Sequence, residues 1–133
     1  MSSIDSDVEE LNRLSNETIG AAIEVHRNLG PGLLESAYES CLSWELRQRG
    51  IAVENQVPVP IRYKGIALDE GYRIDMLVEG KLLLEVKSID TVLPIHTAQV
   101  LTYLKMTGLR MALMLNFNVQ LMRSGIKRIV NEL

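Results

Sequence analysis

The sequence predicts an α/β domain in which helices flank a small mixed sheet. Two helical patterns come first, several strand patterns follow them, and a further helix and strand come after these. The order strand, helix, strand implies two parallel neighbours, because such a crossover returns the chain to the same edge of the sheet. With 133 residues, the chain is also long enough to bury one core.

The N-terminal third contains the first two predicted helices. Apolar residues recur at mostly helical spacing over residues 8–28, and Gly30-Pro31-Gly32 breaks the pattern. A second helical pattern follows this break, and Gly50 provides a C-cap that ends it. Cys41 falls in the second pattern beside an apolar residue, so we expect it to be a small core residue rather than a nucleophile.

Strand patterns fill the middle of the chain. Residues 53–63 alternate between apolar and polar side chains, and two prolines among them indicate an edge strand or a bulge. Residues 66–78 and 81–87 continue as two more strands. We therefore expect three consecutive strands before the next helix.

The C-terminal third supplies the crossover. A proline suits the first turn of a helix over residues 94–107, and Gly108 ends that helix. Residues 111–117 form a nearly continuous apolar run, as expected of a strand that is buried on both faces. The remaining residues are ambiguous, because 119–123 and 126–130 could form a hairpin.

Composition and charge limit the class of protein. Residues 1–7 are acidic and polar, unlike a secretory signal, so we expect them to be disordered and to precede a single domain over residues 8–133. A single cysteine fits a reducing cytoplasm, and no apolar run approaches the roughly 18 to 20 residues of a membrane helix. The net charge of −3 argues against a general nucleic-acid binder. It does not exclude a nuclease, because a bound metal and a local basic patch can override the global sign.

The segment Asp75–Lys87 carries the strongest functional signal. Asp75, Glu85 and Lys87 lie in what otherwise look like two buried strands joined by a tight turn. An isolated buried charge costs roughly several kcal/mol, so these side chains need partners. A bound cation supplies one, and hard ions such as Mg2+ use one or two carboxylates plus substrate phosphates. The spacing therefore predicts metal-dependent phosphodiester chemistry, with a structural salt-bridge network as the alternative.

The turn between these two strands decides whether the two acids meet. Side chains alternate along a strand, so Glu85 and Lys87 share a face. A two-residue loop at Glu79 and Gly80 turns Asp75 to the opposite face. A loop with an odd number of residues, or a bulge, sets Asp75 across from Glu85. The metal hypothesis therefore requires a three-residue turn or a bulge.

Helical residues could complete the site. Gln99 and Tyr103 are four residues apart and share a helix face, and His96 lies one turn further back. Gln99 could hold a phosphate or orient Lys87, and Tyr103 could contact a nucleic-acid backbone. Taken in isolation, each of the three is better explained as a surface or half-buried residue of its helix than as a functional one.

Two further residues flank the glycine-proline break. Glu35 lies in the first turn of the second helix, where the helix dipole favours an acid, and it could alternatively reach the metal. His26 precedes the break and could add an imidazole ligand or serve a structural role.

The chain resembles a known family over about residues 17–130. The segment Gly32-Leu33-Leu34-Glu35-Ser36-Ala37-Tyr38 matches the pattern that names the GxxExxY proteins, a group usually placed in the PD-(D/E)XK nuclease superfamily. The resemblance implies a restriction-endonuclease-like α/β/α core. The other segments that carry it are Val25-His26, Leu29 to Gly32, Tyr63-Lys64-Gly65, Tyr72 to Asp75, Glu85-Val86-Lys87, His96, Ala98-Gln99, Tyr103-Leu104-Lys105, Asn116-Phe117 and Ile126 to Val130.

This resemblance implies a metal-dependent nuclease. It makes Asp75 and Glu85 the metal-binding carboxylates, with the carbonyl of Val86 as a further ligand and Mg2+ or Mn2+ as the ion. It makes Lys87 the catalytic lysine. The superfamily name begins with proline and aspartate, and this chain has Ile74 in place of that proline.

The resemblance also assigns roles to the helical residues. Glu35, or alternatively His26, would be the extra metal ligand from the first two helices. Gln99 and Tyr103 are similar to the glutamine–tyrosine motif of RecB-like exonucleases and would position the substrate, together with His96.

The expected substrate is nucleic acid, with DNA preferred, and no membrane is involved. Small size and acidity favour a protein partner or a second copy of the chain that delivers the substrate. The rival interpretation is a non-catalytic nucleic-acid-binding or protein-interaction module on a nuclease-like fold. A third is that the acids are only a core ion network, in which case Asp75→Ala abolishes folding.

Overall fold

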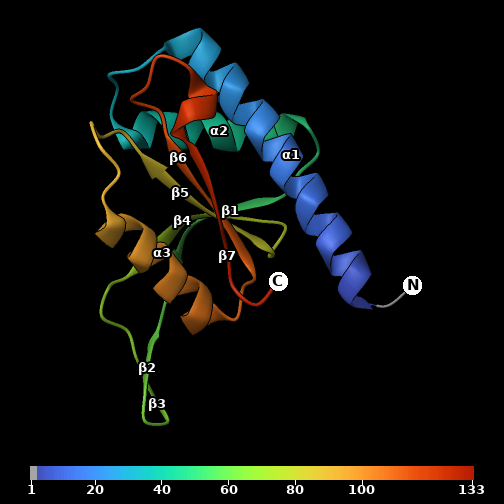
Figure 1. The fold of residues 1–133 in the computed structure, drawn as a ribbon, viewed down its shortest axis with the longest axis vertical. Helices are drawn as coiled ribbons and strands as arrows, with labels where there is room; N and C mark the ends of the chain where they lie inside the picture. The colour runs from blue at the N-terminus through green and yellow to red at the C-terminus, as the bar shows by residue number, and fades with distance from the viewer. Residues whose placement is uncertain (1–2) are drawn as a thin grey trace.

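A computed structural model describes residues 3–133 of the chain, and it contains a five-stranded sheet with helices on both faces (Figure 1). The strand order is β1-β4-β5-β6-β7, and β2 and β3 form a separate two-stranded sheet. The elements are α1 (Ser3–Leu29), α2 (Glu35–Gln48), β1 (Val53–Pro58), β2 (Ile61–Tyr63), β3 (Ile66–Leu68), β4 (Arg73–Val78), β5 (Leu82–Lys87), α3 (Pro94–Thr107), β6 (Met111–Asn116), a 3-10 helix (Met122–Gly125) and β7 (Ile126–Val130).

Two apolar clusters hold the three layers together. One cluster lies between the sheet and helices α1 and α2, and it includes Leu14, Leu42 and Leu84. The other lies between the sheet and α3, and it includes Leu83 and Leu104. Leu83 and Leu84 are neighbours on β5 and belong to opposite clusters, as strand alternation requires. The mixed α/β fold expected from the sequence is confirmed.

The crossover through α3 is confirmed as well. Strands β5 and β6 pair in parallel from Leu82↔Met111 to Lys87↔Asn116, and the other pairs in the sheet are antiparallel. The helix spans the predicted residues, and Gly108 ends it in the left-handed conformation with φ 76°. All six residues of β6 are buried, because helices cover both of its faces.

Each of the first two predicted strands is interrupted in the structure. The pattern over 53–63 divides into β1 and β2 around Val59, whose N–H donates to the Tyr72 carbonyl. The pattern over 66–78 likewise divides into β3 and β4. Consequently β2 and β3 form a ribbon that projects from the body of the protein (Figure 1), joined by a tight turn at Lys64 and Gly65, both with positive φ.

Other sequence expectations also need correction. Helix α1 begins at Ser3, so residues 3–7 are helical where disorder was expected, and residues 1–2 lie outside the described residues. Cys41 is exposed, because Tyr38, Leu42 and Leu46 are the residues that α2 turns toward the sheet. The ambiguous tail forms one 3-10 turn and then a strand, β7, that pairs with β6.

Candidate active site

The β4–β5 turn sets Asp75 opposite Glu85. Val78 pairs with Leu82, so three residues form the turn, and two of them, Glu79 and Gly80, adopt left-handed φ values of 52° and 66°. Continued at the same register, the pairing brings Asp75 across from Glu85. The three-residue turn that the metal hypothesis requires is therefore confirmed.

The ladder between these strands ends just before the two acids. The last backbone pair is Met76↔Leu84. Beyond it, Oδ2 of Asp75 accepts the Val86 N–H at 2.7 Å, and Oε1 of Glu85 accepts the Asp75 N–H at 3.3 Å. Carboxylate oxygens thus replace carbonyl oxygens as acceptors for this part of the sheet.

Strands β1 and β4 change face at this point. Met76 packs in the cluster below α1 and α2, whereas Ile74, two residues earlier, packs in the cluster below α3. Regular alternation would place both on one face. The Asp75 side chain therefore lies between strands rather than on a face, where it meets the N–H that β5 directs toward β4.

The cause of the change is visible in β1. Val53 and Val57 also pack on opposite sides of the sheet. Between them Gln56 has φ 53°, a left-handed conformation that costs a residue with a side chain about 1–2 kcal/mol. The register shows no Gln56↔Asp75 pair, although the pairs on both sides of this position are present.

Glu85 is the most deeply buried acid of the site. Glu85 is only 5% exposed, and this burial raises the pKa of its carboxyl group to about 8. The charge of Asp75 raises the pKa further, whereas the Asp75 N–H and the ammonium of Lys87 lower it. Lys87 is half-buried and shares the Glu85 face of β5 by alternation. Near pH 7 this carboxyl group is mainly protonated in the metal-free protein.

A groove of about 790 Å³ lies along α3, and Asp75, Glu85 and Lys87 are not among the residues that line it. It is lined by Tyr72, His96, Gln99 and Tyr103 among other residues, so the three helical residues expected from the sequence line one surface. The ring of Tyr72 meets that of Tyr103 edge-on at 6.2 Å. Burial raises the pKa of Tyr103, and the charge of Glu85 raises it further, which relates the groove to the acids.

Glu35 reaches the carboxyl end of β5 from α2. Its Oε2 accepts the N–H of Ser88, the residue after Lys87, at 3.0 Å, and the Ser88 hydroxyl donates to the Leu33 carbonyl at 2.6 Å. The buried Tyr38 hydroxyl fixes the same loop, since it donates to the Gly30 carbonyl and accepts the Leu33 N–H. The GxxExxY segment therefore fastens the α1–α2 loop to the end of β5.

His26 lies away from the acids. It is 8% exposed, and its Nε2 is 2.7 Å from the carbonyl of Val119, beyond β6. Its ring also packs near Phe117. Among the residues that the structure describes, no three His, Cys, Asp or Glu side chains lie together so that they could share a metal ion. Within residues 3–133, Asp75 and Glu85 thus come together, whereas Glu35 binds the Ser88 N–H and His26 contacts the Val119 carbonyl.

Sequence reasoning gave no functional role to three residues of this region. Tyr72 lines the groove, and Glu39 of α2 accepts hydrogen bonds from the side chain of Gln56, which in turn lies 3.5 Å from Oδ1 of Asp75. Glu39 follows Glu35 by one helical turn, a spacing that could have suggested it. No sequence signal marks Gln56, because glycine or asparagine is the usual residue in a left-handed conformation.

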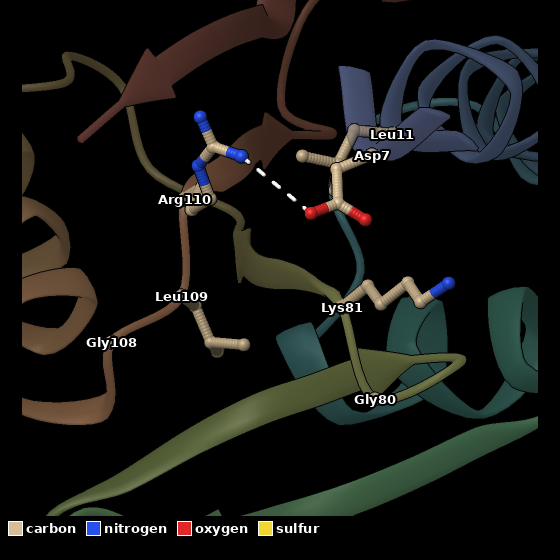
Figure 2. A pocket seen from close by; sticks show the side chains of 7 residues that line it. All are labelled: Asp7, Leu11, Gly80, Lys81, Gly108, Leu109 and Arg110. Atoms are coloured by element: carbon tan, nitrogen blue, oxygen red, sulfur yellow. Dashed lines mark ion pairs between the residues drawn. The ribbon is translucent and has the colours of Figure 1, made fainter. Parts of the chain in front are cut away.

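A second hollow, of about 230 Å³, lies at the opposite end of β5 (Figure 2). Lys81 lines it, together with Asp7 and Arg110, whose charged groups are 3.8 Å apart. Arg110 also donates to the Glu132 carbonyl. The Arg110 guanidinium is thus already engaged, and the hollow contains none of the residues expected for phosphodiester chemistry.

Comparison with known proteins identifies one family. A family model described as the PD-(D/E)XK nuclease superfamily matches residues 12–129, which is most of the chain. No curated protein and no solved structure matches the chain. The sheet flanked by helices is consistent with a restriction-endonuclease-like fold. None of the helices within residues 3–133 combines the length and the apolar character that crossing a membrane requires.

Proposed function

The chain belongs to the PD-(D/E)XK nuclease superfamily, and we propose that it hydrolyses phosphodiester bonds of nucleic acid with the help of a divalent cation. The observation that carries this proposal is the register of β4 and β5. It sets Asp75 across from Glu85, and Lys87 follows on the same face of β5. Two carboxylates and a lysine in this arrangement suit a cation, a phosphate and a water molecule.

The chemistry of the donor set suits a hard cation. Asp75 and Glu85 supply oxygen atoms, and the carbonyl of Val86 lies between Glu85 and Lys87 in the chain as a further candidate ligand. The raised pKa of Glu85 supports the assignment, because a buried carboxyl group gains most from a positive partner. If Mg2+ or Mn2+ were held there, it would supply polarisation of the phosphate and a lowered pKa for a water ligand.

The protein residues then have separate roles. Asp75 and Glu85 would hold the cation, and Lys87 would orient the attacking water and stabilise negative charge on the phosphate. Glu35 is proposed as the outer ligand, which requires its carboxylate to release the Ser88 N–H or to share an oxygen. His26 is left out of this site because its ring faces Val119.

The groove beside α3 is the proposed substrate channel. Gln99 and His96 offer polar groups along its wall, and Tyr72 and Tyr103 offer aromatic rings on whose faces a base can stack. Nucleic acid is the substrate that the superfamily implies, and DNA is the preferred form. The acidic chain is expected to receive its substrate from a protein partner or a second copy of itself.

The proposal extends to membership of the GxxExxY group within the superfamily. It is supported by the contacts of the motif residues, which together hold the α1–α2 loop against the end of β5. Gly32 adopts φ 100°, Glu35 binds Ser88, and Tyr38 ties the intervening loop.

Substitution of the acid and the lysine tests the function. We expect Asp75→Asn and Lys87→Ala to fold and to lose Mg2+- or Mn2+-dependent cleavage of DNA. Lys105→Ala, at an exposed lysine of α3, serves as the matched control and is expected to cleave like the parent. Equal cleavage by the two site variants and the parent would reject the assignment.

The second candidate is a non-catalytic module that binds nucleic acid or protein. The observation that favours it is that, within residues 3–133, no three His, Cys, Asp or Glu side chains lie together so that they could share a metal ion. Calorimetric titration separates the two functions, since the module binds no Mg2+ or Mn2+ at pH 8 and the nuclease binds it.

A further inference from the structure

Gln56 occupies the one gap in an otherwise continuous register between β1 and β4. Pairs run from Val53↔Val78 to Asn55↔Met76 and resume at Val57↔Ile74. The gap coincides with the left-handed backbone of Gln56, and the residue across from it is Asp75. The distortion in one strand is thus located beside the acid in the next.

The side chain of Gln56 connects two carboxylates. Its Nε2 lies 3.0 Å and 3.3 Å from the two oxygens of Glu39 and 3.5 Å from Oδ1 of Asp75. An amide nitrogen has two hydrogens, so it can donate to both partners at once. Gln56 thereby links α2 to the Asp75 carboxylate.

Glu39 is itself held in place by its neighbours. The amide of Asn55 donates to Glu39 at 3.0 Å and to Ser43 at 2.8 Å. The oxygen of Asn55 in turn accepts from Arg47 at 3.0 Å. This fixed network on α2 and β1 gives the Gln56 amide a defined position.

Both oxygens of Asp75 are therefore engaged from different directions. Oδ2 accepts the Val86 N–H at 2.7 Å from β5, and Oδ1 faces the Gln56 amide from β1. Each oxygen keeps one further lone pair for a cation. An uncharged amide also holds the carboxylate without adding a positive charge that would compete with the cation, as arginine or lysine would.

We propose that Gln56, held by Glu39, is a positioning residue that orients the Asp75 carboxylate for the divalent cation. The inference rests on the proposed function, because it takes Asp75 as a metal ligand. Hydrogen bonds to a ligating carboxylate orient it, and their loss typically lowers metal affinity about 10- to 100-fold.

The test uses substitutions that accept the left-handed backbone. Gln56→Gly removes the side chain at a conformation that glycine adopts readily, and Gln56→Asn keeps an amide whose shorter stem cannot reach both carboxylates. We expect both variants to keep the melting temperature of the parent and to bind Mn2+ about tenfold more weakly in calorimetric titrations. Glu39→Gln keeps an acceptor for the amide, and a smaller loss of affinity is expected.

The control is Glu54→Gly, which places a glycine on the same strand at an exposed position outside this network. It is expected to bind Mn2+ like the parent. If Gln56→Gly and Gln56→Asn bind Mn2+ as tightly as the parent, the positioning role is wrong and the proposed function stands. If the parent itself binds no Mn2+, the proposed function and this inference both fail.

Discussion

The strand N–H groups have different acceptors at the two ends of the β4–β5 hairpin. At the turn end, backbone pairs from Met76↔Leu84 to Val78↔Leu82 satisfy the strands, and the Lys81 N–H donates to the Val78 carbonyl. At the open end, the carboxylates of Asp75 and Glu85 accept the strand N–H groups. A regular ladder is self-sufficient, whereas the open end keeps its shape through side chains that also suit a cation.

The charges of the two ends differ in the same way. At the turn end, Asp7 and Arg110 form an exposed ion pair beside Lys81 (Figure 2). At the open end, two acids lie together, and one of them is buried with a raised pKa. At the turn end, backbone groups alone hold the strands together, and the charged side chains have no part in the pairing. At the open end, the same carboxylates both accept the strand N–H groups and are proposed to bind the cation. Substitutions at the two ends should therefore have very different effects.

Deletion of Gly80 should have the largest effect. A two-residue turn shifts the register by one and sends the buried side chains of β5 to the opposite faces. We expect loss of cooperative thermal unfolding and of Mn2+ binding, measured by calorimetry. Gly80→Asn keeps three residues and tolerates the left-handed conformation, so it should remain close to the parent. A folded deletion variant with parental metal affinity would contradict the register argument.

Glu85→Gln should change how stability depends on pH. The folded pKa of Glu85 lies near 8 and the ordinary value is 4.5, so between these values the folded protein holds the extra proton. The free energy of unfolding of the metal-free parent therefore falls as pH rises through this window. The variant should match the parent near pH 4.5 and exceed it by on the order of a few kcal/mol at pH 9.

Denaturant titrations at the two pH values measure this difference. Glu54→Gln, at an exposed position on β1, is the control and should show no such divergence. Parallel curves for Glu85→Gln and the parent across the window would show that folding does not raise the pKa of Glu85.

Asp75→Ala and Asp75→Asn should separate the two roles of this carboxylate. Alanine leaves the Val86 N–H without its acceptor, a loss of about 1–3 kcal/mol, whereas asparagine retains an acceptor oxygen. Both variants should lose Mn2+ binding. Chemical denaturation checks stability, and equal stability of the two variants would show that the Val86 bond contributes little. A complete failure of both variants to fold would favour the core ion network.

Asp7→Asn should have the smallest effect. The ion pair with Arg110 is long and exposed, and such pairs contribute roughly 0–1 kcal/mol. The melting temperature should change by little more than the error of the measurement, and Mn2+ affinity should not change. A clear loss of metal affinity would show that the two ends of the hairpin are coupled.

Much of the architecture was accessible from the sequence because periodicity reflects burial. The bounds of α3 and the buried strand β6 followed from a proline, a glycine and an apolar run. The sequence pattern did not determine the length of the β4–β5 turn. A turn with an odd number of residues was predicted because Asp75 must lie across from Glu85 to share a metal ion with it. The acids could meet in no other regular register.

Other parts depended on tertiary contacts that no local pattern encodes. The alternation over 53–63 predicted neither the β2–β3 ribbon nor the left-handed backbone of Gln56. Glycine is the usual residue in that conformation, so a glutamine gave no signal of it. His26 lies near the end of a helix, where polar residues are common, so the local sequence does not assign it a role. Its structural role depends on the contact with the Val119 carbonyl, 93 positions later in the chain. The roles of Asp75, Glu85 and Lys87 remain predictions that the variants above test.

The bond between Glu35 and Ser88 also bears on the order of folding events. These residues lie 53 positions apart, whereas the β4–β5 hairpin closes over three residues. Short hairpins form within about 1–10 μs, and contacts between distant segments form later because a longer loop must close. The two acids are therefore expected to approach each other early during folding, before the α1–α2 loop docks. Docking of that loop on the end of β5 would then be a late step, and the nascent chain would hold an incomplete site until its N-terminal third returned to the sheet.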